Sequence, residues 1–403
     1  MQARKDWAES GVLALTGRLE GPPVVPLGEA PSWARRWAAW ILDSVAASGT
    51  SLNGLDGAAL LGERAAFTGH TRQGRTSVGG YARLLPTADG WAALSCARPD
   101  DIGLLGAMIG STIDGDPWPA VANWLATRVD DEVNDRMDLL GIAGGCVRGR
   151  EAGSARAGLS PELPRAARSL DGAVVVDFSA LWAGPLCAHI LGAAGARVIK
   201  VETPNRPDGA RLGNKDFYDL LHAGHESVVL DPNQPGERAA LTALVDSADV
   251  VIEASRPRAL ARFGLDAHAA AARGCAWISI TADGRSSNRV GFGDDVSASA
   301  GLVAWENEIS PVFVGDAIAD PLTGLRAAVC ALDARNTSAG RVWDVSMTEV
   351  VSSTLTFSGV EHDAGDANDV PTAREPRGRT PDGHASASGT HTAAVLAELG
   401  IRP

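Results

Sequence analysis

Three arginines in the segment SRPRALAR have a spacing that suits a phosphate-bearing ligand. Arg258 and Arg262 are four residues apart, which puts them one turn apart on the same face of a helix, and Arg256 precedes them. A ligand with phosphate groups needs positive charge gathered locally, and an acidic protein can supply it. A solvated helix face accounts for the same spacing, so the pattern alone leaves both interpretations open.

Asp320, in the segment PVFVGDAIADPLTG, has the chemistry of a nucleophile. The pKa of an aspartate is about 4, so its carboxylate is ionised at neutral pH and needs no general base. The same residue also suits a helix N-cap, because Pro321 follows it and proline favours the first helical position. The two roles are compatible, and the segment by itself is typical of a cap.

Motifs of the commonest α/β enzymes are missing. After the first predicted strand the turn reads SALWAGPLC, in which Gly184 stands alone and no G-x-G-x-x-G occurs. The sequence also lacks a G-x-x-x-x-G-K-[ST] phosphate loop and a G-x-S-x-G nucleophile elbow. The five cysteines are scattered, without a C-x-x-C pair or zinc spacing, so neither a metal site nor a disulfide framework is expected.

Composition excludes further classes. The formal net charge is -13, which argues against nucleic acid as a partner because phosphate backbones need a basic face. The first residues lack the apolar stretch of a signal peptide, and no run of about 18 apolar residues occurs. We therefore expect a cytoplasmic protein without a membrane span.

Short apolar runs alternate with helical patterns between residues 172 and 350. The expected strands cover residues 173–178, 197–202, 227–231, 248–254 and 276–281. Such alternation predicts an α/β fold with a doubly wound parallel sheet and right-handed crossovers.

The N-terminal part has a different pattern. It predicts a helix over 33–47, a hairpin over 79–95 that turns at Asp89-Gly90, and a helix pair over 120–140. These elements indicate a second, smaller α+β domain. The predicted division is 1–70, 71–147 (small domain), 148–170 (linker), 171–350 (α/β domain), 351–388 (flexible segment) and 389–403 (C-terminal helix).

The run DFSALWAGPLCAHILGAAGARVIKVE resembles the opening of the family III CoA-transferases, the CaiB/BaiF group that includes formyl-CoA transferase. Further blocks are similar to that family in the same order. They are SVVLD (227–231), ADVVIEASRPRALARFGLD (248–266), AIADPLTGL (317–325), WDVSMTE (343–349) and GTHTAAVLAELG (389–400). The resemblance implies a Rossmann-like CoA-binding domain.

The resemblance also implies an activity and a site. Asp320 matches the family's nucleophile, which accepts CoA from an acyl-CoA thioester and passes it to a carboxylic acid. A glycine turn at Gly79 and Gly80 would stabilise the oxyanion. No cofactor is implied, since coenzyme A enters as part of the substrate, and relatives suggest a homodimer. Positions that match CoA contacts are Leu181, Trp182, Ala183, Leu230, Arg256 and Arg262.

Departures from the family keep two alternatives open. Many relatives carry a polar residue at Trp182, and an N-x-x-K segment stands where this chain has His222 and His225, for which a surface or structural role is expected. A racemase of 2-methylacyl-CoA would need a histidine in 291–301, where the sequence offers Asp294 and Asp295, and since neither replaces an imidazole this alternative is disfavoured. The third hypothesis is a non-catalytic CoA-binding subunit.

The order of the blocks is unusual. Residues 9–28 resemble the stretch before the nucleophile and partly repeat residues 300–315, but the nucleophile's place falls near Ser32 or Trp33. Residues 1–70 are therefore interpreted as a degenerate partial copy. In this hypothesis the N-terminal side supplies the small domain, and its glycine turn closes over Asp320 within one chain or across a dimer.

Overall fold

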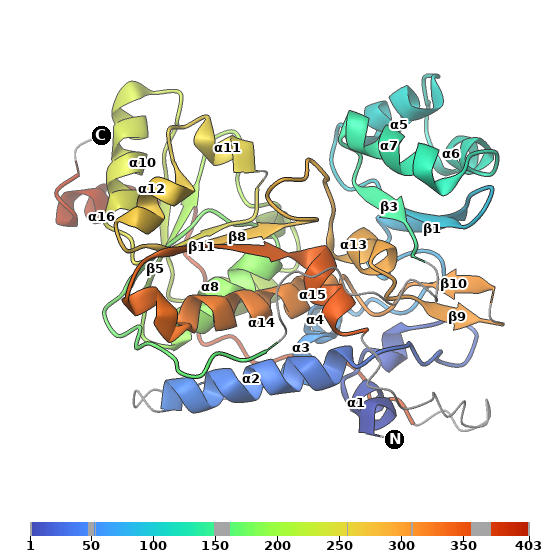
Figure 1. Cartoon of the computed structure of the whole chain (residues 1–403), viewed down its shortest axis with the longest axis horizontal. Helices are drawn as coiled ribbons and strands as arrows, with labels where there is room; N and C mark the ends of the chain where they lie inside the picture. Colours follow the sequence, from blue (N-terminus) through green and yellow to red (C-terminus); the bar gives the residue numbers. More distant parts are fainter. Residues whose placement is uncertain are drawn as a thin grey trace.

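The chain is described by a computed structural model that covers residues 2–46, 52, 54–148, 162–255, 257–307, 309–355 and 372–401. Its centre is a six-stranded sheet in which all strands run parallel (Figure 1). In spatial order the strands are β11 (Arg341–Ser346), β8 (Ala276–Thr281), β7 (Val250–Glu253), β4 (Val174–Asp177), β5 (Arg197–Glu202) and β6 (Glu226–Val229).

Helices cover both faces of this sheet, which explains why its strands are rich in Val and Ile. One apolar cluster joins Val175 and Ile278 of the sheet to the helices on one face, and a second joins Val176 and Val228 to those on the other. The first face holds α8 (Ala183–Ala193), α9 (Lys215–His222), α14 (Ala319–Leu332) and α15 (Met347–Ser353). The second face holds α10 (Pro235–Asp246), α11 (Pro257–Ala261), α12 (Ala267–Ala272) and α16 (Thr392–Glu398). The predicted doubly wound α/β fold is confirmed.

The smaller α+β unit is also present. Its three-stranded antiparallel sheet has the order β1 (Ala82–Pro86), β2 (Trp91–Ser95), β3 (Gly144–Cys146). Three helices complete it, and they enclose an apolar cluster of their own: α5 (Asp101–Ile109), α6 (Trp118–Leu125) and α7 (Asp130–Leu140). The hairpin turns at the predicted residues, where Gly90 donates its N–H to Thr87 Oγ1 at 2.8 Å.

The N-terminal residues pack against the α/β unit. Helix α2 (Ala30–Ala46) lies along α14, and its Trp37 and Ile41 are buried in the same cluster as Leu325 (Figure 1). The other N-terminal helices are α1 (Gln2–Glu9), η1 (Leu13–Leu15), α3 (Gly57–Leu60) and α4 (Glu63–Thr68). Helix α13 (Gly293–Ser299) contacts both the small sheet and α14, so it links the two units.

The remaining segments include the linker and the flexible segment of the predicted domain division, which stays a prediction. Residues 149–161 of the expected linker and 356–371 of the expected flexible segment lie outside the described residues. Residues 372–388 of that segment pack on the rest of the chain, where Arg374 donates its N–H to Ala8 O and Ala385 pairs with Ala223. The short elements that complete the fold are η2 (Gly209–Leu212), η3 (Ala334–Thr337), β9 (Ala304–Glu306) and β10 (Ser310–Val312). No helix among the described residues has the length and apolar character needed to cross a bilayer.

Candidate functional site

The strand order marks a crevice in the sheet. From β4 the chain moves outward through β5 to β6, and it then returns to β7 and continues in the opposite direction to β8 and β11. Ligands of open parallel sheets bind at the carboxyl ends of the strands where the order reverses, here between β4 and β7. The loop after β4 carries Leu181 and Trp182, and the loop after β7 carries Arg256, which lies outside the described residues.

The loop after β4 has a strained backbone that buried charges hold in place. Leu181 has a φ of 69°, which is rare for a residue with a side chain, yet this side chain is 41% exposed. Its N–H donates to Asp208 Oδ1 at 3.0 Å. Lys200, buried in β5, donates to the Ser179 carbonyl at 2.9 Å and lies 2.9 Å from Asp208 Oδ2. A strained, exposed apolar residue on a fixed loop is typical of a ligand contact.

Trp182 and Ala183 begin helix α8 beneath this loop. Trp182 is 1% exposed, and its ring meets the edge of Phe217 with the centroids 5.3 Å apart. The guanidinium carbon of Arg64 lies 5.2 Å from the centroid of the same ring. Trp182 therefore forms a wall of the site under Arg64, and Ala183 is buried beside it.

The remaining predicted CoA contacts lie elsewhere. Leu230 is 1% exposed and belongs to the apolar cluster between the sheet and α10, so its side chain faces the core. This placement gives no support to a contact through the Leu230 side chain. Arg262 follows α11 and is exposed to solvent. It is available to a ligand at that surface.

Asp320 occupies the first turn of α14, but it does not cap the helix. The N-cap residue is Ile318, and the turn before it is shaped by Ala317, whose φ is 47°. Asp320 donates its N–H to Ala317 O at 2.9 Å, and Ala317 donates its own to Asp294 Oδ1 at 2.8 Å. Its carboxyl packs closely on Gly293, where a Cβ atom would lie 2.7 Å from Asp320 Oδ2. The cap predicted from Pro321 is wrong because the helix starts two residues earlier.

Arg64 of helix α4 joins the N-terminal half of the chain to this group. Its Nε donates to Asp316 Oδ2 at 2.8 Å, and its Nη2 donates to Asp316 Oδ1. A Cβ atom placed on Gly79 would lie 3.7 Å from Arg64 Nη2, whereas one on Gly80 would have no atom within 4 Å. The predicted glycine turn therefore lies beside Arg64 within one chain, with open space at Gly80.

The carboxyl groups around Asp320 hold protons more tightly than usual. Burial is the largest effect on Asp320 and raises its pKa to about 7. The Arg64 charge, next in size, acts to lower this pKa, and the charges of Asp294 and Asp316 act to raise it. Burial and the charge of Asp316 likewise raise the pKa of Asp294 to about 7. Burial raises the pKa of Asp295 to about 6, although its Oδ1 accepts a hydrogen bond from Ser95 Oγ at 2.6 Å. The expectation that Asp320 is ionised well below neutral pH is corrected.

The two histidines for which a surface or structural role was expected are buried. His222 and His225 lie with their ring centroids 5.5 Å apart, close to Lys200, and His222 Nε2 is 3.8 Å from Asp208 Oδ2. Burial and the Lys200 charge lower the pKa of His225 to about 3 and that of His222 well below its usual range. Both rings are therefore neutral near pH 7 and have a structural role.

Sequence patterns did not indicate Arg64 and Asp316. Arg64 stands in the segment GERAAF, which carries no motif, and its partner is 252 residues away. In the described part of the chain, no group of three or more His, Cys, Asp or Glu residues is arranged to bind a metal ion.

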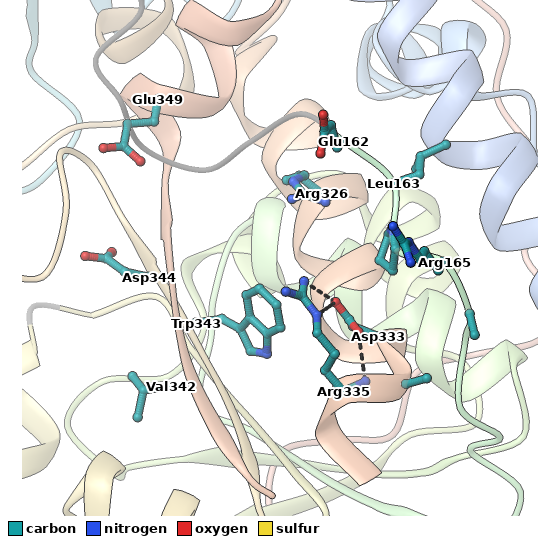
Figure 2. Close-up of a pocket in the computed structure, with 13 residues that line it drawn as sticks. Glu162, Leu163, Arg165, Arg326, Asp333, Arg335, Val342, Trp343, Asp344 and Glu349 are labelled. Carbon is teal, nitrogen blue, oxygen red and sulfur yellow. Dashed lines mark hydrogen bonds and ion pairs between the residues drawn. The ribbon is translucent and has the colours of Figure 1, made fainter. Parts of the chain in front are cut away.

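A separate cavity of about 930 Å³ lies at the open side of β11 and contains none of the predicted site residues. Figure 2 shows Trp343 of β11 and Arg326 of α14 on its walls, with Arg335 bonded to Asp333 at its base. Its lining carries both acidic and basic side chains, among them Arg165 and Glu349. This cavity is distinct from the crevice between β4 and β7.

Comparisons with known proteins point to one family of CoA-transferases. The family model for CoA-transferase family III matches residues 170–394, more than half of the 403 residues. Succinyl-CoA--D-citramalate CoA-transferase from Chloroflexus aurantiacus is 31% identical over 206 residues, 46% of this chain and 51% of that protein. Succinate--glutarate CoA-transferase from Agrobacterium fabrum is 28% identical over 218 residues, 48% of this chain and 54% of that protein.

The solved structures with similarity to the chain are also partial matches. A CAIB/BAIF family protein from Brucella suis is 28% identical, with a TM-score of 0.43, and the match covers 47% of this chain and 56% of that one. The chain thus spans about half the length of the curated relatives named above. Because the family model matches more than half of its residues, the chain belongs to CoA-transferase family III.

Proposed function

We propose that the protein transfers coenzyme A from an acyl-CoA thioester to a carboxylic acid, with Asp320 as the covalent carrier. The observation that supports this most is the gathering of Asp320, Arg64, Trp182 and the Gly79–Gly80 turn in one chain. No cofactor is needed, because coenzyme A enters as part of one substrate and leaves as part of one product.

The proposed reaction has two halves. The Asp320 carboxylate attacks the thioester carbon, the C–S bond breaks, and a mixed anhydride forms as CoA thiolate leaves. The thiolate then attacks the aspartyl carbonyl, which releases the donor acid and leaves an aspartyl-CoA thioester. The acceptor carboxylate repeats these two steps in reverse, so that acyl-CoA departs and the Asp320 carboxylate is restored.

The chain's own residues have defined parts in this scheme. The positive charge of Arg64 counteracts the neighbouring carboxylates that raise the pKa of Asp320, so it favours the ionised form of the nucleophile. Open space at Gly80 allows the thioester oxygen to approach the backbone N–H groups of the glycine turn. Leu181 and Arg262 are exposed to contact the CoA.

Covalent trapping tests the proposal. Incubation with acyl-CoA and hydroxylamine, followed by mass analysis, should give a hydroxamate on the peptide that contains Asp320. Asp320→Ala should show neither the adduct nor turnover. An adduct on another residue, or unchanged turnover in this variant, contradicts the proposal.

A racemase of 2-methylacyl-CoA is a second candidate, favoured by one observation. Asp294 is a second carboxyl with a pKa raised to about 7 close to Asp320, so two groups near the substrate can hold or release a proton. Exchange of the substrate's α-hydrogen with deuterated water, without a trapped adduct, would favour this activity over transfer.

We also propose that the protein forms a homodimer. Light scattering coupled to size-exclusion chromatography tests it, and a mass of one chain would contradict it.

A further inference from the structure

We propose that Arg64 binds the carboxylate of the acceptor acid through its Nη1 group, so that the N-terminal half of the chain selects the acceptor. This inference rests on the proposed CoA transfer. It assigns the recognition of one substrate to a residue outside the segment that matches the family.

The guanidinium of Arg64 is fixed on two sides. Nε and Nη2 form a fork-like pair with Asp316, which is fully buried, and the face of the guanidinium lies over the Trp182 ring. Among the described residues, none accepts a hydrogen bond from Arg64 Nη1, and the Arg64 side chain is 29% exposed. One edge of a rigid donor group therefore remains available to a ligand.

The negative charge around Asp320 has to be offset by a hydrogen-bond donor such as Arg64 when a second carboxylate binds there. Asp294, Asp295 and Asp316 all act to raise the pKa of Asp320, which means that this region repels negative charge. An acceptor acid arrives as a carboxylate and must come within bonding distance of the aspartyl carbonyl. Arg64 is the cation whose charge acts on Asp320, so it offsets this repulsion where the acid must bind.

The glycine turn lies next to Arg64. The nearest part of the glycine turn is Gly79, where a Cβ atom would be 3.7 Å from Nη2, and Gly80 has open space around it. Substitution by larger residues at these two positions would narrow the same space. In the proposal, the acid contacts Arg64 and lies beside this turn.

The test compares Arg64→Lys with a matched control, Arg98→Lys. Arg98 also pairs with a buried aspartate, Asp101, its side chain is 31% exposed, and its guanidinium carbon lies 5.9 Å from the Phe292 ring centroid. Lysine keeps the charge but lacks the planar fork, so it cannot hold Asp316 and a ligand in the same geometry. Initial rates are measured against acceptor acid at saturating acyl-CoA, and adduct formation is measured with acyl-CoA alone.

In Arg64→Lys the KM for the acceptor acid should rise roughly ten- to a hundred-fold, the range for a lost hydrogen bond to a charged group. The KM for acyl-CoA and the yield of the Asp320 adduct should change less than threefold, and Arg98→Lys should match the wild type. An unchanged acceptor KM, or an equal rise in both KM values, overturns the inference. Failure of the wild-type chain to form any adduct would instead refute the proposed function.

A second variant guards against misfolding. The double variant Arg64→Gln, Asp316→Asn replaces the buried ion pair by two neutral amides and leaves no unpaired charge. Assayed at pH 8.5, above the pKa of about 7 that Asp320 has in the wild type, it should keep adduct formation, and its rate should rise linearly with acceptor concentration without saturating. Retention of the wild-type acceptor KM in this folded variant also overturns the inference.

Discussion

Replacing Asp320 by asparagine should stabilise the folded chain at alkaline pH. Burial and neighbouring carboxylates raise the pKa of Asp320 from 3.8 to about 7, so the folded state keeps a proton that the unfolded state releases over this range. The stabilisation from this proton is complete below pH 3.8 and is lost as the pH rises to about 7. Asparagine has nearly the same shape and never carries the charge, so it avoids that loss.

The size of the effect follows from the pKa change. A rise from 3.8 to about 7 corresponds to at most about 4 kcal/mol of unfolding free energy. Because the Asp320 side chain is partly exposed, water screens part of this electrostatic effect. We therefore expect Asp320→Asn to raise the free energy of unfolding by roughly 2–4 kcal/mol at pH 8. At pH 5 the gain should fall below about 2 kcal/mol, since most of the proton transfer lies above that pH.

Urea denaturation at pH 5 and pH 8 measures both gains. Asp333, at the other end of α14, provides the control: burial raises its pKa, but hydrogen bonds from Arg335 outweigh this and lower it. Asp333→Asn should therefore lose stability at pH 8. If Asp320→Asn is no more stable than the wild type at pH 8 while the control behaves as expected, the electrostatic account of the site is refuted.

Other predictions follow from the same geometry. The value of kcat/KM should rise with pH through about 7 as Asp320 ionises, and Asp294→Asn should shift this midpoint to lower pH; an unshifted profile contradicts the coupling. Lys200→Met should cost about 3–5 kcal/mol in chemical denaturation, because it leaves two buried aspartates without their cation, and a loss under 1 kcal/mol would be inconsistent with this. His225, whose pKa is lowered to about 3, stabilises the fold only while neutral, so acidification below pH 6.5 should reduce the melting temperature, and His225→Phe should reduce this loss. Leu181→Gly should relieve backbone strain of about 1 kcal/mol while raising the KM for acyl-CoA; an unchanged KM removes Leu181 from the ligand site.

The sequence predicted the sheet well because its strands carry their signal locally. Residues 197–202 and 276–281 were expected as strands, and β5 and β8 have these bounds. A strand buried on both faces is a short run of apolar residues, which can be recognised without knowing its neighbours. The role of Asp320 as nucleophile, taken from its block of similar sequence, stays a prediction, and its expected role as helix cap was wrong.

The parts of the site that depend on distant contacts were not predictable. Arg64 and Asp316 meet only in the folded chain, and neither stands in a motif. The raised pKa of Asp320 comes from burial and from the carboxylates of Asp294, Asp295 and Asp316 on two other stretches of the chain, so composition could not indicate it. His222 and His225 stand in a polar stretch of sequence, HAGHES, yet tertiary packing buries both rings.

The packing of α2 on α14 has a consequence for synthesis on the ribosome. Trp37 and Ile41 emerge early, but the helix that covers them ends at Leu332, so nearly three hundred residues must be made before they are shielded. During that interval the nascent chain presents an apolar surface to chaperones and to other chains. Separately expressed halves should for the same reason be recovered together, by association, more readily than either half alone.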